Sequence, residues 1–132
     1  MSHKLVQVKD VLNDRFHMVD GKLTVLEAMK VAQKYGSEAL VIEKRHDHDE
    51  FGFVTLADIA KQVISKDKSP ERVNVYEIMA KPVLGVRPDM DVRYCARLFE
   101  RFGISKAPVI DGEEVLGMVG YEDIVLKGMY SE

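Results

Sequence analysis

Residues Gly52–Ile59, with the sequence GFVTLADI, recur further along the chain as Gly117–Ile124, GMVGYEDI. Segments on the amino-terminal side of this motif also occur in pairs and in the same order: Val8–Leu12 with Val75–Met79, Val25–Gly36 with Val92–Gly103, and Ala39–Ile42 with Ala107–Ile110. Two copies of one unit therefore make up most of the 132 residues. An internal duplication predicts two related structural units, so a ligand cleft is expected twice, in diverged form.

The composition is that of an ordinary globular chain, with 46% hydrophobic and 31% charged residues. One repeat alone would bury little of its surface, so we expect the two repeats to share one core. The net charge of -3 gives no general reason to expect nucleic-acid or membrane binding. No signal peptide or long apolar run is present, which favours a cytoplasmic location. The single cysteine, Cys95, falls on an apolar helix face and is expected to be a buried thiol.

Each repeat is expected to contain a strand, a helix, two strands and a second helix. In the first repeat, Thr24–Glu27 has the capping-box pattern, and the following helix is expected to end at Gly36. Its buried stripe is expected to consist of Val25, Ala28, Met29, Ala32 and Tyr35. The dipeptide Asp111-Gly112 predicts a tight hairpin in the second repeat, where the first repeat has the longer loop Glu43–Glu50.

The second helices are expected at about residues 56–64 and 121–129. The polar segment between the repeats is typical of a linker. These observations place the first repeat at residues 8–64, the linker at 65–74 and the second repeat at 75–130.

The order of elements, its tandem duplication, and the motifs Gly52–Ile59, Gly103–Asp111 and Gly117–Ile124 resemble a pair of CBS domains, also called a Bateman module. The resemblance implies an α/β fold, a tandem CBS-domain pair of two pseudo-twofold related β-α-β-β-α repeats. It also implies clefts between the repeats for an adenosine-containing ligand: AMP, ADP, ATP, S-adenosylmethionine or NAD. The implied role is that of a regulatory energy or metabolite sensor, and the implied assembly is a homodimer packed through helices.

Thr55 and Asp58 are the clearest candidate site. A carboxylate accepts hydrogen bonds from both ribose hydroxyls, and a charge-assisted bond contributes roughly 1.5–3 kcal/mol. Thr55, at the expected start of the second helix, offers a hydroxyl to the ribose or to a phosphate. Thr-x-x-Asp is also a helix-capping pattern, with Thr55 as the N-cap residue. The local pattern alone favours capping, whereas the resemblance favours ligand binding, so both roles stay open at this point.

The second repeat retains Asp123 but has Gly120 at the position of Thr55, and so lacks the hydroxyl. We infer two unequal clefts, the one at Asp58 being more complete; alternatively, Gly120 makes room for a bulkier ligand. The resemblance also implies an adenine slot in each cleft, formed by His17, Met18, Ala39 and Leu40 in the first and by Leu84, Gly85, Lys106, Ala107 and Pro108 in the second. For the apolar members, packing in the core is the alternative.

Two charged patterns are weaker indications. Arg97 and Arg101 continue a four-residue spacing from Arg93, which is typical of a solvated helix face, with phosphate binding as the alternative. His46 and His48 could face the same way in the long loop, but two ligands do not make a metal site, and no metal is expected.

The chain contains no Gly-x-Ser-x-Gly elbow and no phosphate loop, so an enzyme is not expected. No cofactor is required, and an adenine nucleotide or S-adenosylmethionine is expected as a regulatory ligand.

The alternative function is a ligand-independent scaffold for dimerisation or for an unidentified protein partner, with Asp58 and Asp123 acting only as first-turn helix residues. Several apolar residues near the second helices could form such an interface or belong to the core: Ile64, Val125, Leu126 and Met129.

Overall fold

Residues 5–129 are described in the computed structural model of the protein, and they fall into two units. The Thr55 unit comprises Arg15–Val83, and the Asp123 unit comprises Met1–Asp14 together with Leu84–Glu132. The end predicted for the second repeat, Tyr130, lies outside the described residues.

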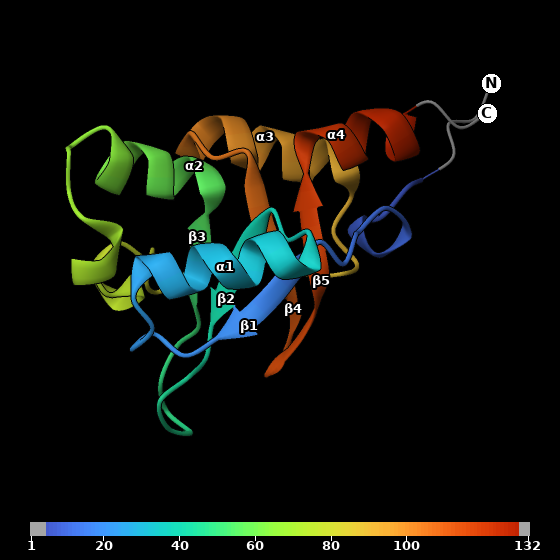
Figure 1. The fold of residues 1–132 in the computed structure, drawn as a ribbon. Coiled ribbons are helices and arrows are strands. Elements are labelled where there is room, and N and C mark those ends of the chain that lie inside the picture. The colour runs from blue at the N-terminus through green and yellow to red at the C-terminus, as the bar shows by residue number, and fades with distance from the viewer. Residues whose placement is uncertain (1–4, 130–132) are drawn as a thin grey trace. The chain divides into compact units, whose positions relative to one another are not determined.

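The Thr55 unit contains a three-stranded sheet in the order β1-β2-β3. Strands β1 and β2 are parallel because a helix, α1, connects them, whereas β2 and β3 are antiparallel. Figure 1 shows α1 crossing this sheet. The elements are β1 (Phe16–Val19), α1 (Val25–Tyr35), β2 (Ala39–Ile42), β3 (Gly52–Thr55) and α2 (Leu56–Ile59), which continues as a π-helix over Ala60–Ile64. Short 3-10 helices follow at Pro70–Arg72 and Val75–Glu77.

The Asp123 unit repeats this order with a smaller sheet. A 3-10 helix, Val8–Asp10, is followed after residue 84 by α3 (Val92–Phe102), β4 (Lys106–Asp111), β5 (Glu114–Gly120) and α4 (Tyr121–Asp123), which continues as a π-helix over Ile124–Met129. Strands β4 and β5 form an antiparallel hairpin.

The first strand expected in the second repeat is reduced to one residue. Val86 donates its N–H to Pro108 O and accepts from Ile110 N, which makes a single parallel bridge to Val109. The next bonds of this parallel ladder would need the N–H groups of residues 88 and 108, and both are prolines, which have no N–H to donate. The prediction of a full strand here is therefore wrong.

Helix α1 begins and ends as the sequence predicts, and α3 occupies the segment that pairs with it in the second repeat. Thr24 Oγ1 accepts a hydrogen bond from Glu27 N at 3.1 Å, and Glu27 Oε1 accepts one from Thr24 N at 2.9 Å. Both helices end at a glycine, Gly36 or Gly103, with φ of 65°, a left-handed conformation that costs glycine little.

One member of the predicted buried stripe of α1 is not buried. Val25, Ala28 and Ala32 are buried, and Met29 is half-buried, but Tyr35 is 55% exposed. Its ring stacks on the imidazole of His17 in β1, with the centroids 4.2 Å apart and the planes 7° from parallel. A side chain in the last turn can lie flat on the edge strand in this way instead of entering the core, so the prediction for Tyr35 is wrong.

The connection between the last two strands differs between the units as predicted. In the Asp123 unit the pairing runs to Asp111 opposite Glu114, with Gly112 at φ 62° in the turn between them. In the Thr55 unit a longer loop joins Ile42 to Gly52, and it is visible at the lower end of the sheet in Figure 1.

Each unit contains the first segment of the other repeat, here called its leading segment: residues 75–83 of the second repeat lie in the Thr55 unit, and residues 8–14 of the first repeat lie in the Asp123 unit. In the Thr55 unit, Val25 N donates to Val73 O at 2.7 Å and Val75 N donates to Leu23 O at 2.9 Å. The Asp123 unit has the equivalent bonds, from Val92 N to Val6 O at 3.0 Å and from Val8 N to Met90 O at 2.8 Å. The exchange of leading segments is therefore reciprocal, and each donor and acceptor has its counterpart in the other repeat.

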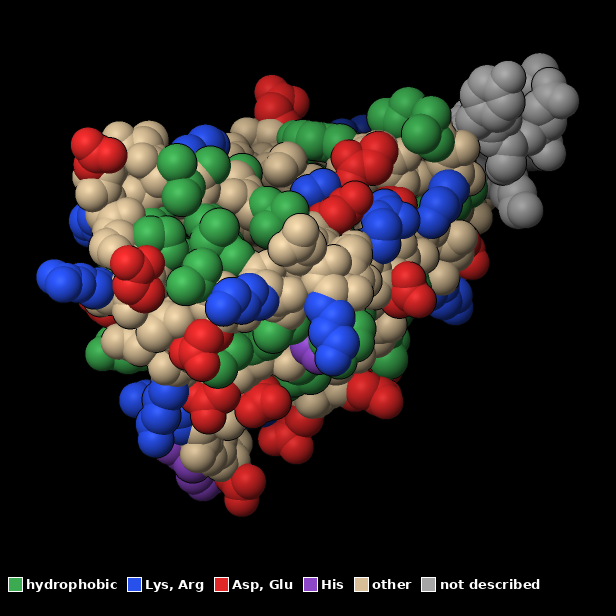
Figure 2. All heavy atoms as spheres, viewed as in Figure 1, with side chains coloured by type: hydrophobic (Ala, Val, Ile, Leu, Met, Phe, Trp, Pro, Cys, Tyr) green, Lys and Arg blue, Asp and Glu red, His purple; other side chains and the backbone are tan. Residues whose placement is uncertain are grey.

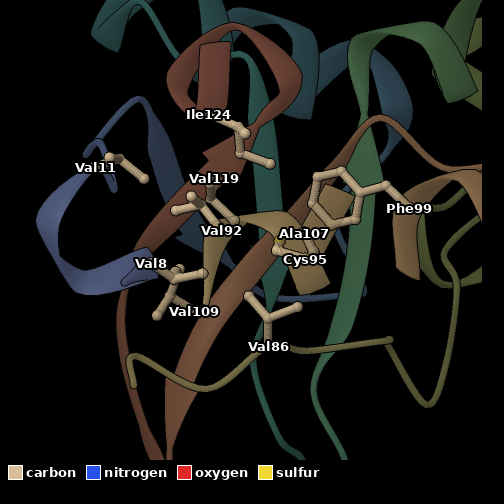
Figure 3. Packing of buried hydrophobic residues seen from close by; sticks show 10 residues of the cluster. All are labelled: Val8, Val11, Val86, Val92, Cys95, Phe99, Ala107, Val109, Val119 and Ile124. Carbon is tan, nitrogen blue, oxygen red and sulfur yellow. The ribbon is translucent and has the colours of Figure 1, made fainter. Parts of the chain in front are cut away.

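Buried hydrophobic residues form two clusters, one in each unit, whereas the sequence analysis expected one shared core. The cluster of the Asp123 unit is drawn in Figure 3 and consists of Val8, Val11, Val86, Val92, Cys95, Phe99, Ala107, Val109, Val119 and Ile124. The exchanged segment supplies two of its members, which helps to explain how so small a unit fills its own interior. Cys95 is fully buried as predicted, and burial raises the pKa of its thiol to about 11.

Candidate functional site

Thr55 and Asp58 lie at the junction where β3 ends and α2 begins. Thr55 Oγ1 accepts a hydrogen bond from Asp58 N at 3.0 Å, and Asp58 Oδ2 accepts one from Thr55 N at 2.9 Å. The two side chains therefore form a complete capping box. The other carboxylate oxygen of Asp58, Oδ1, has no partner among residues 5–129, and the side chain is half-buried. Capping thus occupies only part of the acceptor capacity of Asp58.

The residues expected around adenine in the first cleft lie at different register positions of the sheet. Ala39 in β2 is directly opposite Thr55, and His17 in β1 is directly opposite Leu40. Ala39 and Leu40 are fully buried, and Leu40 belongs to the hydrophobic cluster of this unit. Met18 is 37% exposed. The structure therefore places Ala39 beside Thr55, Leu40 and His17 one register position further along, and Met18 one position beyond them. His17 and Met18 are the more accessible side chains.

Asp123 has a different environment from Asp58. Its side chain is buried, with 2% exposed, and Oδ2 accepts hydrogen bonds from Asn13 Nδ2 at 2.6 Å and from Gly120 N at 2.9 Å. Oδ1 lies 3.4 Å from Lys127 Nζ. Both carboxylate oxygens thus interact within the unit, so a ligand would have to displace existing partners to use this carboxylate.

A second acidic side chain fills the space beside Gly120. A β-carbon added at Gly120 would lie 2.6 Å from Glu122 Oε1, so the carboxylate of Glu122 occupies the place that corresponds to the Thr55 side chain. Lys106 Nζ holds that carboxylate at 2.9 Å, and this bond lowers the pKa of Glu122. Glu122 thereby engages the ammonium of Lys106, which would otherwise be available to a ligand phosphate.

The other residues predicted for the second cleft occupy neighbouring positions in the Asp123 unit. Lys106 pairs with Gly120 across the hairpin, and the side chains of Ala107 and Pro108 are buried. Leu84 and Gly85 lead into the bridge at Val86, and a β-carbon on Gly85 would lie 2.9 Å from Ile110.

The predicted cationic residues Arg97 and Arg101 lie on the exposed face of α3. Within residues 5–129, no hydrogen bond or ion pair joins either of them to Asp123. Their placement is that of a solvated helix face.

The sequence analysis missed Asn13, whose side-chain amide donates a hydrogen bond to the carboxylate of Asp123. The signal is a difference between the repeats. The backbone of Asn13 forms an antiparallel bridge with Met118, and the backbone of Ala80 forms the equivalent bridge with Phe53. One repeat therefore has an amide side chain at this position and the other has only a methyl group, which explains why Asp58 has no such partner.

No three His, Cys, Asp or Glu side chains within residues 5–129 lie in an arrangement that could hold a metal ion. Over the same part of the chain, no helix has both the length and the apolar character needed to cross a bilayer.

The fold and the capped Thr-x-x-Asp junction define a duplicated α/β module, and comparison with known proteins identifies its family. A family model described as CBS domain matches residues 75–129. The hexameric CBS-CP12 protein from bloom-forming cyanobacteria is 36% identical, with a TM-score of 0.90 over 94% of this chain and 72% of that chain. The chain belongs to the CBS-domain proteins and is a tandem CBS-domain pair.

Two further relatives are informative. The CBS domain pair of protein MJ0100, solved in complex with 5'-methylthioadenosine and S-adenosyl-L-methionine, is 29% identical over 93% of this chain and 95% of that chain, with a TM-score of 0.77. An uncharacterized protein of Methanopyrus kandleri is 30% identical over 103 residues, which is 77% of this chain. The chain spans only 52% of the length of that relative.

Proposed function

We propose that the protein is a regulatory module that binds an adenosine-containing ligand and has no catalytic activity of its own. The observation that carries the proposal is the half-buried carboxylate of Asp58, whose Oδ1 has no partner among residues 5–129 although its Oδ2 caps α2. The complex of the related MJ0100 pair with two adenosine-containing molecules supports the ligand class. AMP, ADP, ATP, S-adenosylmethionine and NAD share the ribose that this carboxylate would recognise.

The recognition follows from the hydrogen-bonding capacity of the two side chains. An ionised carboxylate only accepts hydrogen bonds, and the two hydroxyls of a ribose can donate to it. The Thr55 hydroxyl accepts from Asp58 N and keeps its own hydrogen for a ribose or phosphate oxygen. Consecutive residues of a strand face opposite sides of the sheet, so His17, whose ring stacks on Tyr35, and Met18 offer an aromatic and an apolar surface on different faces of β1.

The two candidate sites are proposed to be unequal, with the Asp58 site the stronger. Asp123 already interacts through both oxygens, and Glu122 occupies the position of the missing threonine side chain. An adenine nucleotide would therefore bind first at Asp58.

Replacing Asp58 by alanine is expected to raise the dissociation constant of the adenosine ligand roughly 10- to 150-fold, since a charge-assisted hydrogen bond contributes about 1.5–3 kcal/mol. Calorimetry and thermal unfolding with AMP, ADP, ATP, S-adenosylmethionine and NAD measure this change. Ligand at about 100 times its dissociation constant should stabilise the wild type by roughly 2.7 kcal/mol.

Asp14→Ala is the matched control, because Asp14 is exposed and lies outside the candidate site. A 2'-deoxyribonucleotide should bind the wild type more weakly than its ribonucleotide does. The Asp58→Ala variant should bind the two nucleotides with the same, low affinity. If no compound of the panel binds to folded protein that is free of carried-over nucleotide, the proposal is wrong and the scaffold function is favoured.

We also propose that the protein forms homodimers through exposed apolar side chains of its helices. Ile64, Val125 and Leu126, which the sequence offers as interface or core residues, are 53%, 56% and 67% exposed, and the side chain of Met129 lies outside the described residues. In the Thr55 unit, hydrophobic side chains also gather between α1 and α2 on the face shown in Figure 2, beside a groove lined by Met29, Ala32, Gln33, Ser37 and Leu56. These exposed side chains would serve a protein partner if the scaffold function holds.

Replacing Leu126 by glutamate is expected to shift the protein from dimer towards monomer, because a charged group would enter an apolar interface. Light scattering at micromolar concentration measures the mass. Tyr76→Glu is the control, since Tyr76 is similarly exposed, at 54%, but lies outside these helices. A wild type that is monomeric with and without ligand would refute the dimer.

A further inference from the structure

A second pocket lies at the opposite end of the Thr55-unit sheet from Thr55. Ile42 and Gly52 pair at this end, whereas Ala39 and Thr55 pair at the other. The pocket has a volume of about 370 Å³, within the range of small-molecule sites. It opens beside the carboxyl ends of the parallel strands β1 and β2, an edge at which α/β sheets often bind ligands. Nothing in the Asp58 site uses this space.

The walls of the pocket are apolar and are shaped by two glycines. A β-carbon on Gly52 would lie 2.5 Å from Met79 Sδ, and one on Gly21 would lie 3.1 Å from Ile42 Cγ2. The missing side chains thus allow Met79 and Ile42 to line the hollow. Tyr76 N donates to Gly21 O at 3.1 Å, which places Tyr76 at the same pocket with 54% of the side chain exposed.

The rim of the pocket carries charges of both signs. Arg45, Lys22 and Lys81 supply positive charge, and Glu43 and Asp20 supply negative charge. The terminal guanidinium nitrogens of Arg45 and the carboxylate of Glu43 have no hydrogen-bond or ion-pair partner within residues 5–129. A ligand can therefore reach one free cationic and one free anionic group at one apolar pocket.

Arg45 and Lys81 are held in position by Asp49, which is only 7% exposed. Asp49 accepts from Lys81 Nζ at 2.7 Å, from Arg45 N at 2.8 Å and from Arg45 Nε at 3.2 Å. The bond from Lys81, followed by that from the backbone of Arg45, holds the pKa of Asp49 well below its usual range. The long loop between β2 and β3, seen in Figure 1, is thereby tied to residue 81 and presents Arg45 at the pocket.

We propose that this pocket binds a free α-amino acid with an apolar side chain. Its carboxylate would pair with Arg45, its ammonium with Glu43, and its side chain would enter the space between Ile42, Met79 and Tyr76. A purely anionic ligand would place its charge near Glu43 and Asp20 without compensation, and a purely cationic one would meet Arg45 and Lys22. A zwitterion satisfies both groups, and the site is independent of the Asp58 site.

The test is a titration of isotope-labelled protein with L-phenylalanine, followed by the amide signal of Gly21. Saturable shifts are expected for L-phenylalanine, and binding should be roughly tenfold or more weaker for N-acetyl-L-phenylalanine, which lacks the ammonium, and for L-phenylalaninamide, which lacks the carboxylate. Equal or tighter binding of either derivative would overturn the zwitterion assignment, and an absence of saturable shifts with all three would overturn the site.

Variants connect each charge of the ligand with one side chain. Arg45→Gln should weaken L-phenylalanine roughly tenfold without weakening L-phenylalaninamide, and Glu43→Gln should weaken L-phenylalanine without weakening the N-acetyl derivative. Lys61→Gln, on the π-helix after α2, is the matched charge control and should bind like the wild type. Asp58→Ala should also bind L-phenylalanine like the wild type, which separates this site from the proposed nucleotide site. Tyr76→Ala, an exposed substitution, should weaken all three compounds; unchanged binding would place the ligand elsewhere.

Discussion

Replacing Asp123 by alanine is expected to lower the free energy of unfolding by roughly 2–4 kcal/mol. The substitution leaves Asn13 Nδ2 and Gly120 N without their acceptor in a buried place, and it removes the charge beside Lys127. Buried donors that lose their partner cost more than exposed ones, because water does not replace the bond. Urea denaturation followed by circular dichroism measures the difference.

Asp58→Ala is the matched comparison for this prediction. Asp58 has the same place in its repeat, but it is half-buried and accepts one bond, from Thr55 N, so its loss should cost about 1 kcal/mol in the absence of ligand. A double-mutant cycle with Asn13→Ala should give a coupling energy of about 1 kcal/mol or more with Asp123 and none with Asp58. Equal destabilisation by the two aspartate substitutions would show that the bonds to Asn13 and Gly120 do not decide the difference.

Phe99→Ala is expected to be the most destabilising single substitution considered, at roughly 3–5 kcal/mol. The ring of Phe99 is fully buried in the cluster of Figure 3 and meets the ring of Tyr121 edge-on, with the centroids 5.4 Å apart. Truncation leaves a cavity that the surrounding valines cannot close without moving the backbone.

Phe102→Ala on the same helix is the control, because Phe102 is 58% exposed and its loss should change the stability by about 0.5 kcal/mol or less. Both variants are measured by the same urea denaturation. A similar effect at both positions would contradict the assignment of Phe99 to the core.

Much of the fold could be predicted because local signals in the two repeats agree. The capping box at Thr24 and the glycines after α1 and α3 set helix ends through bonds within a few residues. Asp111-Gly112 determines the turn between β4 and β5 through its own backbone conformation, which is also a local signal. The repeat then supplied the order of elements, since a feature found once could be checked against its second copy.

The parts that sequence reasoning missed depend on contacts between distant residues. Asn13 reaches Asp123 from a position 110 residues away, and no local pattern reveals such a bond. Tyr35 has helical spacing suited to the core, but stacking on His17 draws its ring to the surface. The roles of Asp58 and Thr55 in ligand binding stay a prediction, because the capping box alone accounts for the hydrogen bonds that these two side chains form in the structure.

The exchange of leading segments has a consequence for the order of folding during synthesis. Residues 5–14 leave the ribosome before residues 15–129, yet the partners of Val8 and Val11 in their hydrophobic cluster lie at residue 86 and beyond. Such contacts have high sequence separation, and high contact order slows folding. The Thr55 unit is complete at residue 83 and can form its core before the partners of residues 5–14 have been synthesised. Within residues 5–129, the segment that is made earliest is therefore among the last to reach its native contacts.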